Sequence, residues 1–121
     1  MNIESFRKYC LNLRHTEETM PFGPDTLVYK VGGKMFALTG LDEEECSVNL
    51  KCDPEHAIEL REEYPDHIFP GYHMNKRHWN TVFVERGLPE KLILQLIDQS
   101  YSLVIATLPR KIQAEFHPAD E

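Results

Sequence analysis

The sequence is poor in cysteine, and its cysteines do not form a pattern that would hold a fold together. Cys10, Cys46 and Cys52 are odd in number and include no C-x-x-C pair, which argues against a disulfide framework and favours a reducing compartment. The chain has no apolar run of membrane-spanning length, and its first residues lack the apolar segment of a secretory signal peptide. We therefore expect a cytoplasmic protein with no membrane partner.

Positive charge is scarce as well. Thirteen Lys and Arg residues stand against 20 Asp and Glu residues, which leaves a formal net charge of −7. Residues 42–66 hold ten acidic and two basic residues, whereas residues 67–84 hold two basic and no acidic residues. A net negative charge opposes non-specific binding to nucleic acid, which depends on neutralising phosphates. We interpret the acidic stretch as a solvent-exposed surface and residues 67–84 as a weakly basic strip.

Signatures of catalysis and of metal binding are missing too. The sequence has no nucleotide-binding loop and no G-x-S-x-G nucleophile motif. His73 and His78 are five residues apart, which matches no common zinc-ligand or metalloprotease spacing. The acidic run at residues 42–45 is more typical of a solvent-exposed turn than of a metal site. We therefore expect no metal and no cofactor, and we favour a binding protein over an enzyme.

What the chain does contain is a clear succession of helix and strand signals. Gly32-Gly33 between two alternating runs indicates a β-hairpin, and Asp53-Pro54 is typical of a helix start. Pro70 limits its strand to the edge of a sheet. The predicted elements are a helix at 3–14, a loop at 15–25, strands at 26–31, 34–39 and 46–50, a helix at 54–64, strands at 67–72 and 79–85, and a helix at 89–108.

This order, α-β-β-β-α-β-β-α, predicts an α+β fold with helices against a single antiparallel sheet of about five strands. The last helix has a wide apolar stripe, and we expect it to be buried against the sheet through Leu96, Ile97, Tyr101 and Val104. We predict one domain over residues 1–116 and a flexible tail at 117–121.

Residues 70–80 form the most unusual segment of the chain. They hold its single Trp, two histidines and an adjacent Lys-Arg pair, and they include no acidic residue. Aromatic rings stack on bases or fill interface pockets, cations contact phosphates, and Asn side chains read base edges. The candidate binding residues are Lys34, Tyr72, His73, Asn75, Lys76, Arg77, His78, Trp79 and Asn80. For Trp79, which begins a strand, packing in the core is the favoured alternative role.

Several segments carry a resemblance to a known family. They are Met20-Pro-Phe-Gly23, Val28-Tyr-Lys-Val31, Gly33-Lys-Met-Phe-Ala37, Asn49-Leu-Lys-Cys-Asp-Pro54, Pro70-Gly-Tyr-His-Met-Asn-Lys76, His78-Trp-Asn80 and Asp98-Gln-Ser-Tyr101. With them the chain closely resembles the bacterial MmcQ/YjbR family over about residues 1–116. The resemblance implies a fold similar to that of the bacterial frataxin CyaY and of secretion chaperones. It also implies DNA binding by a double-wing motif, with hairpins near Gly32-Gly33 and residues 73–78 as the wings.

Two functional hypotheses result. In the first, the hairpin wings bind DNA weakly, because only two to four cations are available to contact phosphates. In the second, the protein is an interaction or chaperone-like module that binds a protein partner through residues 70–80. That segment has the composition of interface hot spots, and a net charge of −7 suits a protein partner better than DNA. Ionic strength separates the two, since phosphate contacts weaken steeply with salt.

Overall fold

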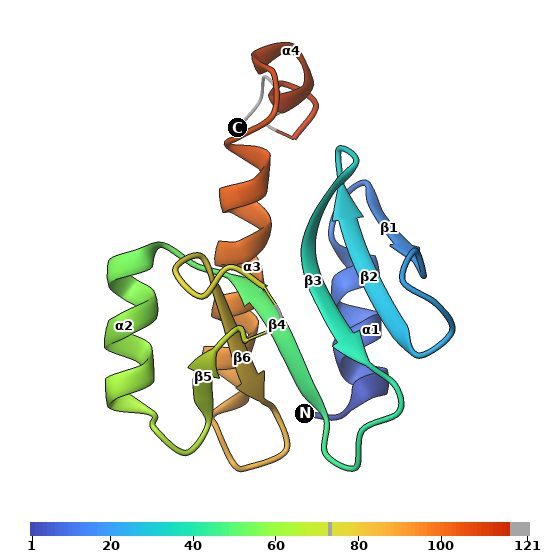
Figure 1. The fold of residues 1–121 in the computed structure, drawn as a ribbon. Coiled ribbons are helices and arrows are strands. Elements are labelled where there is room, and N and C mark those ends of the chain that lie inside the picture. The colour runs from blue at the N-terminus through green and yellow to red at the C-terminus, as the bar shows by residue number, and fades with distance from the viewer. Residues whose placement is uncertain (73, 117–121) are drawn as a thin grey trace.

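The computed structural model describes residues 1–72 and 74–116, and within them the chain folds into one six-stranded antiparallel sheet with four helices. The strands follow the order β1-β2-β3-β4-β6-β5 across the sheet (Figure 1). The elements are α1 Ile3–Asn12, β1 Thr16–Thr19, β2 Thr26–Val31, β3 Lys34–Gly40, β4 Ser47–Lys51, α2 Pro54–Glu63, β5 Ile68–Pro70, β6 Trp79–Phe83, α3 Glu90–Ile105 and α4 Arg110–Gln113. The predicted α+β class with a single antiparallel sheet is confirmed.

Helices cover one face of this sheet and leave the other face open. Figure 1 looks onto the open face, with α1 behind β2 and β3 and with α3 behind β4 and β6. The core lies between the sheet and these two helices, and Phe6 and Ile93 are fully buried there. The predicted stripe of α3 is in place: Leu96, Ile97 and Val104 are buried, while Tyr101 is half-buried. α2 lies beside β5, at the edge of the sheet.

Ser100 explains how α3 is fixed to the middle of the sheet. Strands β3 and β4 pair at Ala37 and Leu50, and the next residue outward on each strand does not continue the ladder. The Oγ of fully buried Ser100 enters this gap: it accepts the N–H of Lys51 at 2.8 Å and donates to the carbonyl of Phe36. The hydroxyl therefore satisfies two backbone groups that a longer β3–β4 ladder would have paired.

The structure corrects the predicted element order at two places. The expected loop at residues 15–25 contains the edge strand β1, which pairs with β2. Its sequence, Thr-Glu-Glu-Thr, has no apolar alternation, so periodicity could not reveal it. Glu18 holds it in place, because its carboxylate accepts two bonds from Arg7 at 2.9 Å and one from the hydroxyl of Tyr29 at 2.7 Å. A short helix, α4, follows α3, and the predicted tail at 117–121 lies outside the described residues.

The predicted hairpin at Gly32-Gly33 is present between β2 and β3. Both glycines have positive φ, 59° and 80°, as tight hairpin turns require. Gly32 is also closely packed, because a Cβ at this position would lie 2.6 Å from a methyl carbon of Leu108. The tip of this hairpin therefore rests on Leu108, in the connection between α3 and α4.

Candidate nucleic-acid or protein interface

The segment at residues 71–78 connects β5 to β6 and is anchored by backbone hydrogen bonds. The N–H of Gly71 donates to the carbonyl of Trp79 at 2.9 Å, and the N–H of Trp79 donates to the carbonyl of Asn75 at 2.9 Å. The carbonyl of His78 accepts the N–H of Cys52 at 2.7 Å, which ties the segment to the end of β4. The described part of the segment is thus a folded turn against the sheet.

Two of the predicted site residues are buried beneath this turn. Trp79 is only 9% exposed, and the absence of a side chain at Gly71 leaves room for it, since a Cβ there would lie 2.9 Å from the Cβ of Trp79. Asn80 is 2% exposed and its Nδ2 donates to the carbonyl of Ala57 at 3.4 Å. Neither residue has the surface needed to contact an outside partner directly. The core role considered for Trp79 matches its position.

The exposed side chains of the segment are Tyr72, Asn75, Lys76 and Arg77. The Nζ of Lys76 lies 5.2 Å from the centroid of the Tyr72 ring, which is a cation–π distance. Asn75 has a local role, because its Oδ1 accepts the N–H of Arg77 at 2.9 Å. His78 is half-buried, and His73 lies outside the described residues. The described part of the segment therefore presents one aromatic ring and two cations to solvent.

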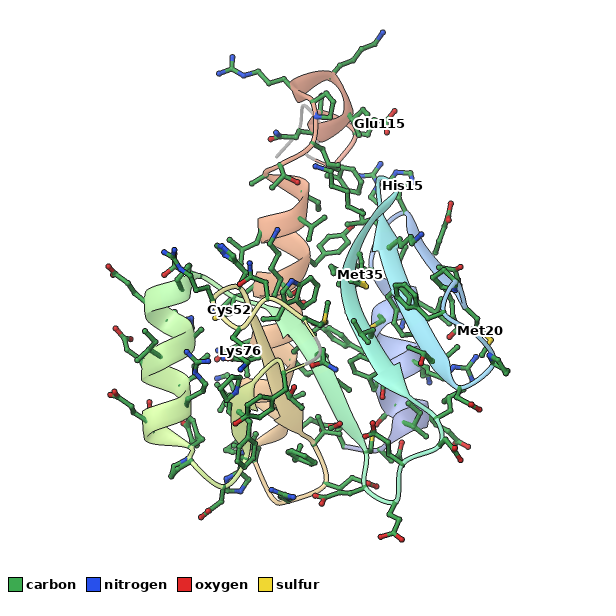
Figure 2. The ribbon with its side chains drawn as sticks, in the orientation of Figure 1. His15, Met20, Met35, Cys52, Lys76 and Glu115 are labelled. Carbon is green, nitrogen blue, oxygen red and sulfur yellow. The ribbon has the colours of Figure 1, made fainter. Side chains whose placement is uncertain are left out.

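Lys34 does not join this group. It lies at the start of β3, and β4 separates β3 from β6. Its Nζ is near the Oγ1 of Thr107, at 3.2 Å, beside the end of α3. In Figure 2, Met35, which follows Lys34, lies across β4 from Lys76. The two lysines therefore lie apart, although Met35 and Met74 of the 70–80 segment line the same hollow on the open face of the sheet.

Lys76 and Arg77 line a cationic pocket together with Arg61 of α2. The pocket has a volume of about 380 Å³ and also includes Glu55 from the first turn of α2. Arg61 binds the segment directly, since its Nη1 donates to the carbonyl of Lys76 at 3.2 Å. Three cations therefore converge here, but the exposed acidic residues of the adjacent helix reduce the positive potential: Glu55, Glu59, Glu62 and Glu63.

A larger concave surface lies on the open face of the sheet. Two hollows of about 320 and 340 Å³ meet at Glu43 and Asn49, and we call them together the open-face depression. Its lining residues come from the five strands β2–β6 and from four loops. The residues that line it are Phe22, Thr26, Met35, Leu38, Gly40, Glu43, Ser47, Asn49, Phe69, Tyr72, Met74, Thr81, Phe83 and Arg86.

The floor of the open-face depression combines aromatic rings with one central polar pair. Phe69 and Phe83 pack edge to face with centroids 5.5 Å apart. Asn49 and Thr81 face each other on β4 and β6, and the hydroxyl of Thr81 donates to the Oδ1 of Asn49 at 2.7 Å. Phe22 and Tyr72 rise at the rim, 68% and 62% exposed. Exposed aromatic side chains around a hollow are typical of binding surfaces.

The charges at the open-face depression leave it net negative. Arg86 lies 3.8 Å from the centroid of the Phe83 ring, and its Nη2 contacts the Oε1 of Glu45 at 2.9 Å. The Arg86 guanidinium lowers the pKa of Glu45, and the two charges cancel. The carboxylate of Glu43 accepts a hydrogen bond from Ser47 Oγ at 3.1 Å, and among the described residues it has no cationic partner.

Sequence reasoning identified Tyr72 at this surface and missed most of the rest. Phe22 lies in Met20-Pro-Phe-Gly23, one of the segments that resemble the family, but the sequence predicted only a loop there. Phe83 follows buried Val82 on β6 and Phe69 follows buried Ile68 on β5, and an outward-facing aromatic ring on each of two paired strands is the signal that could have found them. Arg86, beyond the end of β6, gave no signal.

The described residues include no group of three or more His, Cys, Asp and Glu side chains that could hold a metal ion. One smaller contact is present: the Sγ of Cys52 lies 3.7 Å from the Nδ1 of His56. Burial raises the pKa of Cys52 to about 11, so this cysteine is a neutral thiol at pH 7. The arrangement does not supply a thiolate nucleophile.

Comparison with known proteins places this structure in a family. A family model described as YjbR matches residues 11–103. The chain belongs to the YjbR family. This YjbR-family chain is 37% identical over 115 residues to the uncharacterized protein YbdF of Escherichia coli O157:H7, covering 95% of this chain and 93% of YbdF. It is 39% identical over 100 residues to the uncharacterized protein YyaQ of Bacillus subtilis (strain 168), covering 83% and 79% of the two chains.

A solved structure confirms the fold of this YjbR-family chain. The crystal structure of Deinococcus radiodurans protein DR2400 superposes with a TM-score of 0.90 at 38% identity, over 99% of this chain and 91% of the other. The predicted membership of the MmcQ/YjbR family is confirmed, and the names of these relatives assign no activity. Among the described residues, no helix is long and apolar enough to cross a membrane.

Proposed function

We propose that this protein is an interaction module that binds an extended segment of a partner protein in the open-face depression. The observation that carries the proposal is the junction of two hollows into one largely apolar surface across five strands, with Tyr72 and Met74 of the 70–80 segment on its rim. A strand-like segment presents side chains at alternate positions, which suits hollows that repeat across a sheet.

The charges specify the partner further. Arg86 is neutralised by Glu45, and Glu43 is the uncompensated charge at the centre of the depression. The neighbouring Asp42 and Glu44 add to this negative potential. A complementary segment therefore has apolar or aromatic side chains for the two hollows and a Lys or Arg between them, because opposite potentials set register and specificity.

A displayed library of random peptides tests this proposal. We expect enriched peptides with two apolar positions flanking a basic one. Synthetic versions should bind the wild type and lose about fivefold or more in affinity to Phe22→Ala and to Tyr72→Ala, as is usual for aromatic hot spots. Leu11→Ala is the matched control, since Leu11 is 46% exposed on α1, which packs on the covered face. Peptides that bind both aromatic variants as tightly as wild type would overturn the proposal.

A second copy of the chain is the competing occupant of the open-face depression. Sedimentation at increasing concentration distinguishes it from a foreign segment. Self-association that Phe22→Ala and Tyr72→Ala abolish, without enrichment of any peptide, would replace the proposed partner with a second protomer.

Weak nucleic-acid binding through the cationic pocket is the second candidate function. It is supported by the convergence of Arg61, Lys76 and Arg77, and opposed by Glu55 in the same pocket. Titration with duplex and single-stranded DNA at low and moderate salt tests it. We expect Lys76→Ala with Arg77→Ala to reduce the slope of log affinity against log salt by about two units, roughly one per phosphate contact. No binding at low salt would eliminate this candidate.

A further inference from the structure

Arg86 covers the face of an aromatic ring in one hollow of the open-face depression. We call this hollow, which has a volume of about 320 Å³ and contains the rings of Phe69 and Phe83, the aromatic hollow. Arg86 lies in the connection between β6 and α3. Its guanidinium carbon, Cζ, is 3.8 Å from the centroid of the Phe83 ring and 5.9 Å from that of the Phe69 ring. At 3.8 Å the guanidinium is in van der Waals contact with the face of Phe83.

All three guanidinium nitrogens of Arg86 donate hydrogen bonds. Nε and Nη2 donate to the two carboxylate oxygens of Glu45 at 2.5 and 2.9 Å, and Nη1 donates to the carbonyl of Asp66 at 2.7 Å. Because the N–H groups of a guanidinium lie in its plane, these bonds engage its edges and fix its orientation. The Arg86 side chain is nevertheless 36% exposed. This exposure includes the face opposite Phe83, since Arg86 lines the hollow and its edges are engaged.

This arrangement selects among the side chains that can enter the aromatic hollow. A carboxylate or phosphate gains little there, because the charge of Arg86 is paired with Glu45 and its nitrogens are engaged. A Lys or Arg meets a like charge, and Arg86 already covers the Phe83 face on which such a cation would bind. An aromatic ring is favoured, because a planar ring stacks on the flat face of a guanidinium and is attracted by its charge.

We propose that an aromatic side chain of the bound segment stacks on the free face of Arg86, so that the guanidinium lies between this ring and Phe83. The stack names the class of residue that the aromatic hollow takes. Its assignment to an extended segment of a partner protein rests on the proposed function, whereas the stacking of a ring on Arg86 does not. The basic residue of the same segment then faces Glu43, which lines both hollows.

Titration of ¹⁵N-labelled protein with N-acetylphenylalaninamide tests the stack. N-acetylcyclohexylalaninamide is the matched probe, because it has a saturated ring of similar size. We expect the phenyl probe to shift the Nε–H proton of Arg86 upfield in a saturable manner, since a ring stacked on the guanidinium shields this proton. The cyclohexyl probe buries a similar apolar area but has no π face, so we expect it to bind about fivefold more weakly.

Arg86→Lys should abolish the preference for the phenyl probe, because Lys keeps the positive charge but has no flat face. Arg110→Lys is the matched control, since Arg110 is exposed and does not line the aromatic hollow. Equal or tighter binding of the cyclohexyl probe to the wild type would overturn the proposal, and this comparison needs no variant. An Arg86 Nε–H signal that stays in place while the amide of Phe83 shifts would overturn it as well, and so would an unchanged preference in Arg86→Lys.

The peptide library separates a failure of the stack from a failure of the proposed function. Phe22, whose substitution tests the extended segment, lines the other hollow and not the aromatic hollow. We expect one of the two apolar positions in the enriched peptides to be aromatic. Peptides that depend on Phe22 and Tyr72 but show no aromatic preference would keep the proposed function and overturn the stack. Stacking of the phenyl probe without any enriched peptide would confirm the stack and overturn the extended segment.

Discussion

Replacing Ser100 with Ala should destabilise the protein far more than the loss of one hydroxyl from a helix would suggest. The Ser100 Oγ accepts the N–H of Lys51 at 2.8 Å and donates to the buried carbonyl of Phe36. Ala at this position leaves both backbone groups without a partner and places only a methyl group beside them. An ordinary intramolecular hydrogen bond contributes about 1 kcal/mol, and a buried group left unpaired costs about 1–3 kcal/mol.

The expected loss is therefore about 2–4 kcal/mol, the upper value applying if water cannot reach the Phe36 carbonyl. For a domain of this size that corresponds to a fall of roughly 8–16 °C in Tm. Urea unfolding followed by far-UV circular dichroism measures the free energy, and an unchanged m-value shows that the unfolded and native states keep their compactness. Amide exchange at Lys51 should accelerate in the variant.

Ser102→Ala on the same helix is the matched control. Ser102 is exposed, and Ala has the higher helix propensity, so we expect a change within about 0.5 kcal/mol. A loss below about 0.5 kcal/mol for Ser100→Ala would refute the reasoning, because it would mean that the Lys51 and Phe36 groups find other partners without cost.

Three further predictions concern other parts of the fold. The pKa of Glu18 is lowered, chiefly by its hydrogen bond from Arg7. Its contribution to the free energy of unfolding is therefore present above the unfolded pKa of about 4.3 and is lost as pH falls through the folded pKa. In Glu18→Gln, the free energy of unfolding, followed by circular dichroism, should depend less steeply on pH in this acid range. Gly71→Ala should lower the free energy of unfolding in urea by about 1–3 kcal/mol, because the added Cβ would lie 2.9 Å from the Cβ of Trp79. An unchanged free energy would mean that the backbone at Gly71 shifts without cost. Cys52, buried and with its pKa raised to about 11, should react with a thiol reagent more slowly than half-buried Cys46, and equal rates would contradict the described burial.

Local signals were sufficient for most of the fold. The Gly32-Gly33 hairpin, the Asp53 cap with Pro54, and the apolar stripe of α3 each depend on chemistry within a few residues, and each appears in the structure as predicted. The edge strand β1 was not predicted, since its residues are polar and its stability comes from contacts of Glu18 with α1 and β2. Pairing with a distant strand is not encoded in the alternation of a four-residue segment.

The candidate site was less accessible, because a binding surface is assembled by topology. The composition of residues 70–80 drew attention to one segment, but it could not separate the exposed Tyr72 from the buried Trp79. Trp79 is buried because the chain turns back and packs it against Gly71, eight residues earlier. Composition also grouped Lys34 with Lys76, although β4 separates β3, where Lys34 lies, from β6, which follows Lys76. Phe22, Glu43 and Phe83 come from three distant segments, and Phe22 and Phe83 each share a hollow with Glu43 only because the strand order places β2, β3, β4 and β6 in one sheet.

This assembly bears on the choice between a protein and a nucleic-acid partner. The aromatic side chains gather on the open face, where Glu43 is the uncompensated charge, whereas Lys76 and Arg77 gather beside α2. A nucleic-acid surface needs stacking rings and cations on the same face, since each base that stacks carries a phosphate beside it. Two cations do lie over rings of the open face, Lys76 at 5.2 Å from Tyr72 and Arg86 at 3.8 Å from Phe83, but Glu45 neutralises Arg86. The shortage of uncompensated cations beside these rings therefore supports the proposed protein partner, which would bury apolar side chains here and supply the basic group opposite Glu43 itself.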